Sequence, residues 1–196
     1  LLILPANFST AAILFVTCLV IMFIGRISMK YMLTLIGLGL AGILLIFALS
    51  KTFPKLFPRG TTGVARVDHF LNKEKADSGA TYQVDQAKIA IVSGGILGKS
   101  PGKSTQRNFL PHPYSDFIFA IVIEEYGLAG GSFLLLLYLI LFYRVIRIAS
   151  KSEGNFGSLL VVGIGFSLVF QALINMAVAV NLFPVTGQTL PLVSMG

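Results

Sequence analysis

Long uncharged apolar blocks dominate this chain and are separated by shorter polar segments. Four blocks are close to or above the about 20 residues that a membrane-spanning helix needs. They cover residues 8–25, 31–49, 117–143 and 156–180. Within them we find neither the alternation of a half-buried strand nor the single apolar stripe of a soluble helix. The pattern therefore predicts an all-α polytopic membrane protein with four transmembrane helices.

Composition agrees with this prediction. Hydrophobic residues make up 55% of the chain and charged residues 12%, against the roughly 25% charged residues typical of soluble domains. The single cysteine, Cys18, lies in an apolar block, so no intrachain disulfide or cysteine-rich metal site is expected. The chain begins within apolar Leu1–Leu4, has no secretory leader pattern and stops at Gly196. We expect it to be a fragment of a longer protein.

Two short basic joints set the expected topology. Residues 26–30 and 144–154 connect neighbouring blocks, and the positive-inside rule places both in the cytoplasm. The long loop 51–115 and the tail 181–196 then face outward. The loop holds ten of the fifteen Lys and Arg residues and four of the eight Asp and Glu residues. This charge argues for the opposite topology, but the rule weakens for loops of roughly 60 residues or more.

The basic loop indicates anionic headgroups or a phosphate-bearing substrate, with a merely solvated loop as the alternative. Residues 82–91 have the pattern of a short amphipathic helix at a membrane surface. The glycine-rich run 94–104 lacks the order of a nucleotide-binding P-loop. Its flexible backbone, with Lys99 and Lys103, could still meet a diphosphate, and an ordinary turn is the simpler interpretation.

Asp116 is the candidate with the clearest chemistry. It lies where a polar loop meets an apolar helix, with water on one side and a low dielectric on the other. A carboxylate in that place is suited to act as a general base. The alternative is that Ser115 or Asp116 caps the helix that follows, and both roles can coexist.

Other polar residues occur inside the apolar blocks. Glu124 and Glu125 lie roughly 12–13 Å further along the helix from Asp116. Because acids at that depth are costly, we expect one of them to pair with a basic group or the backbone, with a proton path as the alternative. Gln171 and Asn175 share a helix face and predict interhelical hydrogen bonds. The glycines of the last block predict close helix contacts; they are Gly157, Gly163 and Gly165.

The neighbourhood of Asp116 resembles a known family signature. Leu110-Pro111 leads to Ser115-Asp116-Phe117-Ile118-Phe119-Ala120 and then to Glu124-Glu125-Tyr126-Gly127. This run is similar to the signature of the SEDS family (shape, elongation, division and sporulation). Four further patches resemble family motifs in the same order, at residues 5–11, 82–86, 94–106 and 184–194. The Pro-Gly-Lys-Ser-Thr-Gln form at 101–106 looks more like the division branch, FtsW, than the elongation branch, RodA.

The resemblance implies a ten-helix fold, of which this chain looks like the sixth to ninth helices, with loop 51–115 outside. It also implies a peptidoglycan glycosyltransferase that uses lipid II. The partners would be a class B penicillin-binding protein, other division proteins and membrane lipids, in a bacterial inner membrane at the septum. Nothing in the sequence points to nucleic acid. The family pattern differs at Asn7, Ser9, Asn108 and Thr186, and no role is carried over to them.

By the same resemblance, Asp116 would deprotonate the acceptor sugar hydroxyl. Substrate contacts are expected from Arg66, Gln83 and Gln86 within family motifs, and from Lys99, Lys103 and Arg107 by charge and place. No metal ligands are assigned; a divalent cation, Mg or Mn, is an additional means of neutralising the diphosphate. Two other functions remain open: a lipid II flippase that depends on Glu124 or Glu125, and a division scaffold without catalysis.

Overall fold

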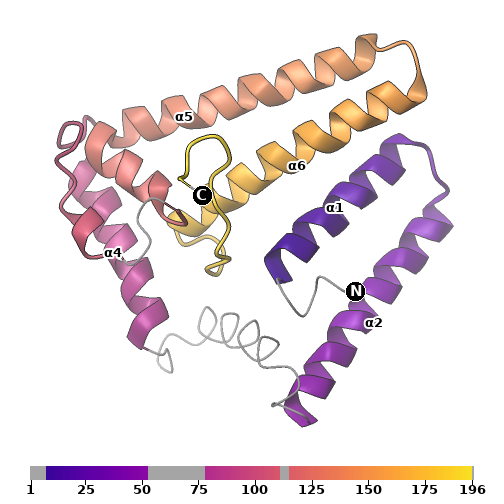
Figure 1. Cartoon of the computed structure of the whole chain (residues 1–196), viewed down its shortest axis with the longest axis horizontal. Helices are drawn as coiled ribbons and strands as arrows, with labels where there is room; N and C mark the ends of the chain where they lie inside the picture. The colour runs from indigo at the N-terminus through magenta and orange to yellow at the C-terminus, as the bar shows by residue number, and fades with distance from the viewer. Residues whose placement is uncertain (1–7, 53–77, 111–114, 196) are drawn as a thin grey trace. The chain divides into compact units, whose positions relative to one another are not determined.

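The computed structural model describes residues 8–52, 78–110 and 115–195, and in these ranges it is helical without strands (Figure 1). Each helix is named with its bounds: α1 (Phe8–Ile24), α2 (Met29–Thr52), α4 (Ser78–Gly94), the 3-10 turn η2 (Gln106–Asn108), α5 (Ile118–Lys151) and α6 (Asn155–Ala179). The chain divides into two compact units. One contains α1, α2 and the joined ends of α5 and α6. The other contains α4, η2, most of α5, the rest of α6 and the segment after it.

The four predicted apolar blocks correspond to α1, α2, α5 and α6. Of these, α5 and α6 are long and apolar enough to cross a membrane, judged by length and composition. Shorter apolar helices cover residues 9–24 and 29–45. The all-helical prediction is therefore confirmed for the described residues. The count of four spans and the outward placement of loop 51–115 and tail 181–196 stay predictions.

Glycines allow close helix packing in the first unit. A Cβ atom added at Gly163 of α6 would lie 2.8 Å from Cδ1 of Ile21 on α1. One added at Gly165 would lie 2.4 Å from a methyl carbon of Val145 on α5. Both distances are shorter than a methyl contact tolerates, so the predicted close helix contacts are confirmed at these two glycines. The space at Gly157 is instead limited by Ser152, which lies in the joint after α5.

The core of the second unit gathers around the start of α5. Its buried side chains come from α4, the turn before α5, α5 itself, α6 and the segment after α6, and include Ala87, Ala90, Phe117, Ala120, Ile121, Ala172, Met176 and Leu190. The helix predicted at 82–91 is confirmed within α4, whose Ala87 and Ala90 are fully buried, while its place at a membrane surface stays a prediction. On the same helix Tyr82, Ile89 and Val92 are exposed.

Helix α5 is broken at Gly127. The backbone there has φ 72° and ψ −175°, so two helical pieces meet at a sharp kink. A break leaves backbone groups without helical partners, and in an apolar environment these groups need others. The loop after α4 supplies them through four backbone hydrogen bonds: Lys99 N–H to Glu124 O (2.9 Å), Ser100 N–H to Glu125 O (3.0 Å), Leu128 N–H to Gly95 O (2.9 Å) and Ala129 N–H to Ile96 O (3.2 Å).

The glycine run therefore serves as a docking loop. A Cβ atom at Gly94 or Gly98 would lie 2.1 or 2.2 Å from a carbonyl oxygen of α5, and one at Gly127 would lie 2.1 Å from the carbonyl oxygen of Ile96. Only the absence of side chains lets the two backbones approach so closely. Neither sequence interpretation of this run, a flexible diphosphate loop or an ordinary turn, included this role.

Candidate active site

Asp116 lies in the turn immediately before α5 and is partly exposed. The hydroxyl of Ser115 donates a hydrogen bond of 2.9 Å to Oδ1 of Asp116, which orients the carboxylate. Among the described residues we find no bond from this carboxylate to an amide of the first turn of α5. The helix-capping alternative therefore has no support from these contacts.

The backbone of this turn is held from two other elements. Nδ2 of Asn175, on α6, donates to the carbonyl oxygen of Asp116 at 2.9 Å. The hydroxyl of Ser194, in the segment after α6, donates to the carbonyl oxygen of Ser115 at 2.9 Å. Two consecutive peptide units next to the candidate base are thus fixed by side chains distant in sequence.

The segment after α6 is itself anchored. Nδ2 of Asn175 also donates to the carbonyl oxygen of Gln188 (2.6 Å), and Nε2 of Gln171 donates to that of Thr189 (3.1 Å). The hydroxyl of Tyr138 donates to the carbonyl oxygen of Pro191. The sequence predicted interhelical bonds for Gln171 and Asn175. That prediction was wrong about the partners, which are backbone carbonyl oxygens outside the helices. Helical spacing shows which residues share a face but does not show which groups lie opposite that face.

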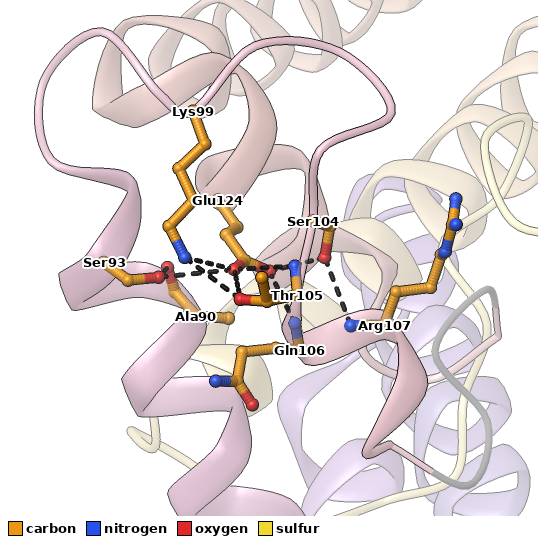
Figure 2. A network of polar contacts seen from close by, with 8 residues as sticks. All are labelled: Ala90, Ser93, Lys99, Ser104, Thr105, Gln106, Arg107 and Glu124. Carbon is orange, nitrogen blue, oxygen red and sulfur yellow. Dashed lines mark hydrogen bonds and ion pairs between the residues drawn. The ribbon is translucent and has the colours of Figure 1, made fainter.

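Glu124 forms a second polar centre (Figure 2). Its side chain is fully buried, with 0% exposure. The carboxylate accepts hydrogen bonds from Nζ of Lys99 (2.7 Å), Oγ of Ser104 (2.5 Å), Oγ1 and N of Thr105 (2.9 and 3.2 Å), N of Gln106 (3.3 Å) and Oγ of Ser93 (3.4 Å). All the donors except Ser93 lie in the loop between α4 and α5, so one carboxylate organises that loop.

A buried carboxylate is tolerated only when its charge is compensated and its lone pairs are satisfied. Lys99 supplies the charge, and the hydroxyl and amide donors supply the remaining bonds. The prediction that Glu124 or Glu125 pairs with a basic group is confirmed for Glu124. Glu125 is only partly buried, and its carbonyl oxygen accepts the bond from Ser100 described above.

The residues predicted to contact the substrate differ in their exposure and in their contacts. Nζ of Lys99 contacts Glu124 and, at 3.1 Å, Oγ1 of Thr105. Lys103 is exposed, and the side chain of Arg107 extends away from the Glu124 network in Figure 2. The two glutamines, Gln83 and Gln86, are partly buried on α4. Arg66 lies outside the described residues. The substrate roles of all six stay predictions.

No group of three or more His, Cys, Asp or Glu side chains within the described ranges could hold a metal ion. The divalent cation considered from the sequence stays a prediction.

Sequence reasoning did not find several of these contacts. Ser93, Thr105 and Tyr138 carried no signal that linked them to Glu124 or to the C-terminal segment. Ser104 and Ser194 lay in recognised motifs, but no role was attached to them. The one signal in the sequence was a loop rich in hydroxyl groups that precedes an acid within an apolar block. It does not show which hydroxyl group donates to which oxygen atom.

The family described as "Cell cycle protein", FtsW/RodA/SpoVE, matches residues 1–196. The chain belongs to the FtsW/RodA/SpoVE family. The SEDS resemblance inferred from the motifs around Asp116 is therefore confirmed.

Individual members of the FtsW/RodA/SpoVE family are also similar to this chain in sequence. Stage V sporulation protein E of Bacillus subtilis is 36% identical over 97% of this chain and 50% of its own length. The probable peptidoglycan glycosyltransferase FtsW of Hydrogenovibrio crunogenus is 45% identical over 68% of this chain and 35% of its own. The peptidoglycan glycosyltransferase MrdB of Escherichia coli K12 is 41% identical over 67% and 36%. Relatives named FtsW support the expected likeness to the division branch.

A solved structure also covers the whole chain, with a TM-score of 0.69 and 28% identity. It is described as "Structural coordination of polymerization and crosslinking by a peptidoglycan synthase complex", and the match covers 52% of that structure's chain. The present chain spans about half the length of Stage V sporulation protein E and of this solved chain.

Proposed function

We propose that this protein is a peptidoglycan glycosyltransferase that polymerises lipid II, with Asp116 as the general base. The observation that carries the proposal is a partly exposed carboxylate, oriented by Ser115, at the start of an apolar helix. Family relatives whose names state this activity support it.

In the proposed reaction, Asp116 takes the proton from the 4-hydroxyl of an acceptor sugar. The freed oxygen forms a bond to the anomeric carbon of the donor. The bond from that carbon to the diphosphate oxygen breaks, and undecaprenyl diphosphate leaves with the electron pair. Each cycle adds one disaccharide to a glycan strand and leaves a proton on Asp116, which water then accepts.

The leaving diphosphate needs positive charge nearby. The side chain of Lys103 is exposed, and that of Arg107 extends away from the Glu124 network in Figure 2. We assign both residues this role. Lys99 is a weaker candidate because its ammonium group is already paired with a fully buried carboxylate. A divalent cation, Mg or Mn, bound with the substrate is an additional source of charge.

The contacts of Glu124 weigh against the flippase alternative. A proton carrier must release and regain its proton, whereas this carboxylate is held by a lysine, hydroxyl groups and backbone amides. The scaffold alternative gains no specific observation from the structure. Glycosyl transfer at Asp116 therefore fits the contacts best.

The proposal extends to the setting of the reaction. We place the enzyme in the bacterial inner membrane, at the division septum, working with a class B penicillin-binding protein and other division proteins. The match to a peptidoglycan synthase complex and the FtsW relatives support this placement. Membrane lipids and lipid II are its expected small-molecule partners.

Polymerisation of labelled lipid II by the full-length protein with its penicillin-binding partner tests the central step. Asp116→Asn keeps the shape of the side chain but removes the base. We expect a loss of at least about 100-fold in rate, the lower range for general-base catalysis. Asp85→Asn is the matched control, because Asp85 is an exposed aspartate on α4 paired with Lys88 at 3.3 Å. Normal polymerisation by Asp116→Asn, with the variant and control equally expressed, would overturn the proposal.

A further inference from the structure

Two consecutive carbonyl oxygens just before α5 accept side-chain hydrogen bonds, and both donors lie far away in sequence. Asn175 contacts the Asp116 carbonyl oxygen from 59 residues away. Ser194 contacts the Ser115 carbonyl oxygen from 79 residues away. Since Ser115 also orients the carboxylate of Asp116 through its hydroxyl, these bonds control the backbone from which both side chains project.

The amide of Asn175 has a defined orientation. Its nitrogen donates to two carbonyl oxygens, those of Asp116 and Gln188. Rotating the amide by half a turn would place its own oxygen against both acceptors, so only one orientation is compatible with these contacts. The side chain is 1% exposed, and its Oδ1 has no hydrogen-bond partner within the described part of the chain.

A buried acceptor without a donor is unfavourable. A residue whose only task was packing would gain nothing from that unsatisfied oxygen, and a leucine of similar size would avoid it. Departures of this kind concentrate at functional sites in natural proteins. The unsatisfied oxygen therefore indicates that the amide nitrogen of Asn175 serves a purpose beyond filling space.

Gln171 provides an internal comparison. It lies one helical turn before Asn175 on the same face of α6, and its amide nitrogen donates to the carbonyl oxygen of Thr189. Both residues thus hold the segment after α6, at neighbouring carbonyl groups. Only Asn175 also reaches the turn that carries Asp116.

We propose that Asn175 is a positioning residue for Asp116, which sets the place of the base through the backbone without touching the substrate. This inference rests on the proposed function of Asp116. Ser194 assists by holding the preceding peptide unit. Because rates of positioned proton transfer are sensitive to displacements of about 1 Å, loosening this turn lowers the chemical rate while leaving substrate binding intact.

Steady-state polymerisation of lipid II by the full-length protein with its penicillin-binding partner tests the inference. We expect Asn175→Leu to lower kcat by about 10- to 100-fold with KM changed by less than about twofold. Gln171→Leu removes one carbonyl contact to the same segment, and we expect a loss below about threefold in kcat. Ser194→Ala, a smaller change that serves if Asn175→Leu fails to fold, should lower kcat by about 3- to 10-fold at constant KM.

Asp116→Asn is measured in parallel to separate the two proposals. Suppose that Asp116→Asn is inactive and that Asn175→Leu folds. If Asn175→Leu then has the same kcat as Gln171→Leu, or if its defect lies in KM, the positioning role is overturned and the proposed function stands. If Asn175→Leu does not fold, an unchanged kcat for Ser194→Ala has the same consequence. If Asp116→Asn is active, the proposed function falls and the inference falls with it.

Discussion

At the residue scale, Glu124 shows how a charge is kept within an apolar helix. Its 0% exposure would be prohibitive for an isolated carboxylate, yet a lysine, hydroxyl groups and two backbone amides surround it. The paired lysine is 25 residues away in sequence and 2.7 Å away in space. The carboxylate thus holds together the loop between α4 and α5.

Glu124→Gln should destabilise the fold. Removing the charge leaves Lys99 without its counter-ion, and breaking a buried ion pair costs about 3 kcal/mol or more. The thermal unfolding midpoint of the purified protein in detergent measures this, with Glu125→Gln as the neighbouring control. Adding Lys99→Met to Glu124→Gln should recover part of the loss. Equal unfolding midpoints for Glu124→Gln and Glu125→Gln would show that the hydrogen bonds of Glu124 do not support the fold.

At the element scale, the break in α5 and the loop after α4 form one unit. Gly127 has a positive φ, and its neighbours exchange backbone hydrogen bonds with residues 95–100. An unbroken helix would satisfy its own backbone groups and would need no hydrogen bonds from the loop. Without the break, the backbone groups of the loop would in turn lose their hydrogen-bond partners on α5. The sequence predicted a span over 117–143 without a break, and the structure adds the kink at Gly127.

Gly127→Ala should disrupt this junction. Its added Cβ would lie 2.1 Å from the carbonyl oxygen of Ile96. The backbone conformation at Gly127, which is essentially restricted to glycine, would cost a further amount of about 1–3 kcal/mol. Gly102→Ala has a similar positive φ, 76° against 72°, but open space around it. Proteolysis of the loop in the folded protein distinguishes them. We expect rapid cleavage only for Gly127→Ala, and equal rates would contradict the junction described here.

At the scale of the whole molecule, positive charge is concentrated in one loop. The net charge is +7, and ten of the fifteen basic residues fall within residues 51–115. Charge gathered in one place raises the local concentration of an anionic substrate, whereas the same charge spread evenly does not. Of these basic residues, Lys103 and Arg107 belong to the loop between α4 and α5 that Glu124 organises.

Replacing Lys103 and Arg107 together by glutamine should lower kcat/KM for lipid II by about 10-fold, because the proposed site loses charge that attracts the substrate and stabilises the leaving diphosphate. The effect should weaken at high salt as screening removes the attraction. The control replaces Arg147 and Lys151 near the end of α5 by glutamine, which removes the same charge elsewhere. A similar loss of kcat/KM in both double variants would indicate a global charge effect and no local site.

Much of the fold and part of the site could be predicted from the sequence. The positions of α1, α2, α5 and α6 follow from apolar blocks, because hydropathy is a local property that each segment carries by itself. The amphipathic helix α4 follows from its own periodicity. Asp116 stands out because the boundary between a polar loop and an apolar helix is visible along the chain.

The sequence by itself determined the class of protein, its family and the candidate base, since all three depend on residues close together in the chain. Only the tertiary structure decided which partners meet. It paired Glu124 with Lys99, placed the glycine loop in the break of α5, and connected Asn175 to Asp116 across 59 residues. Helical spacing indicates which residues share a face, whereas the groups opposite that face depend on how distant segments pack.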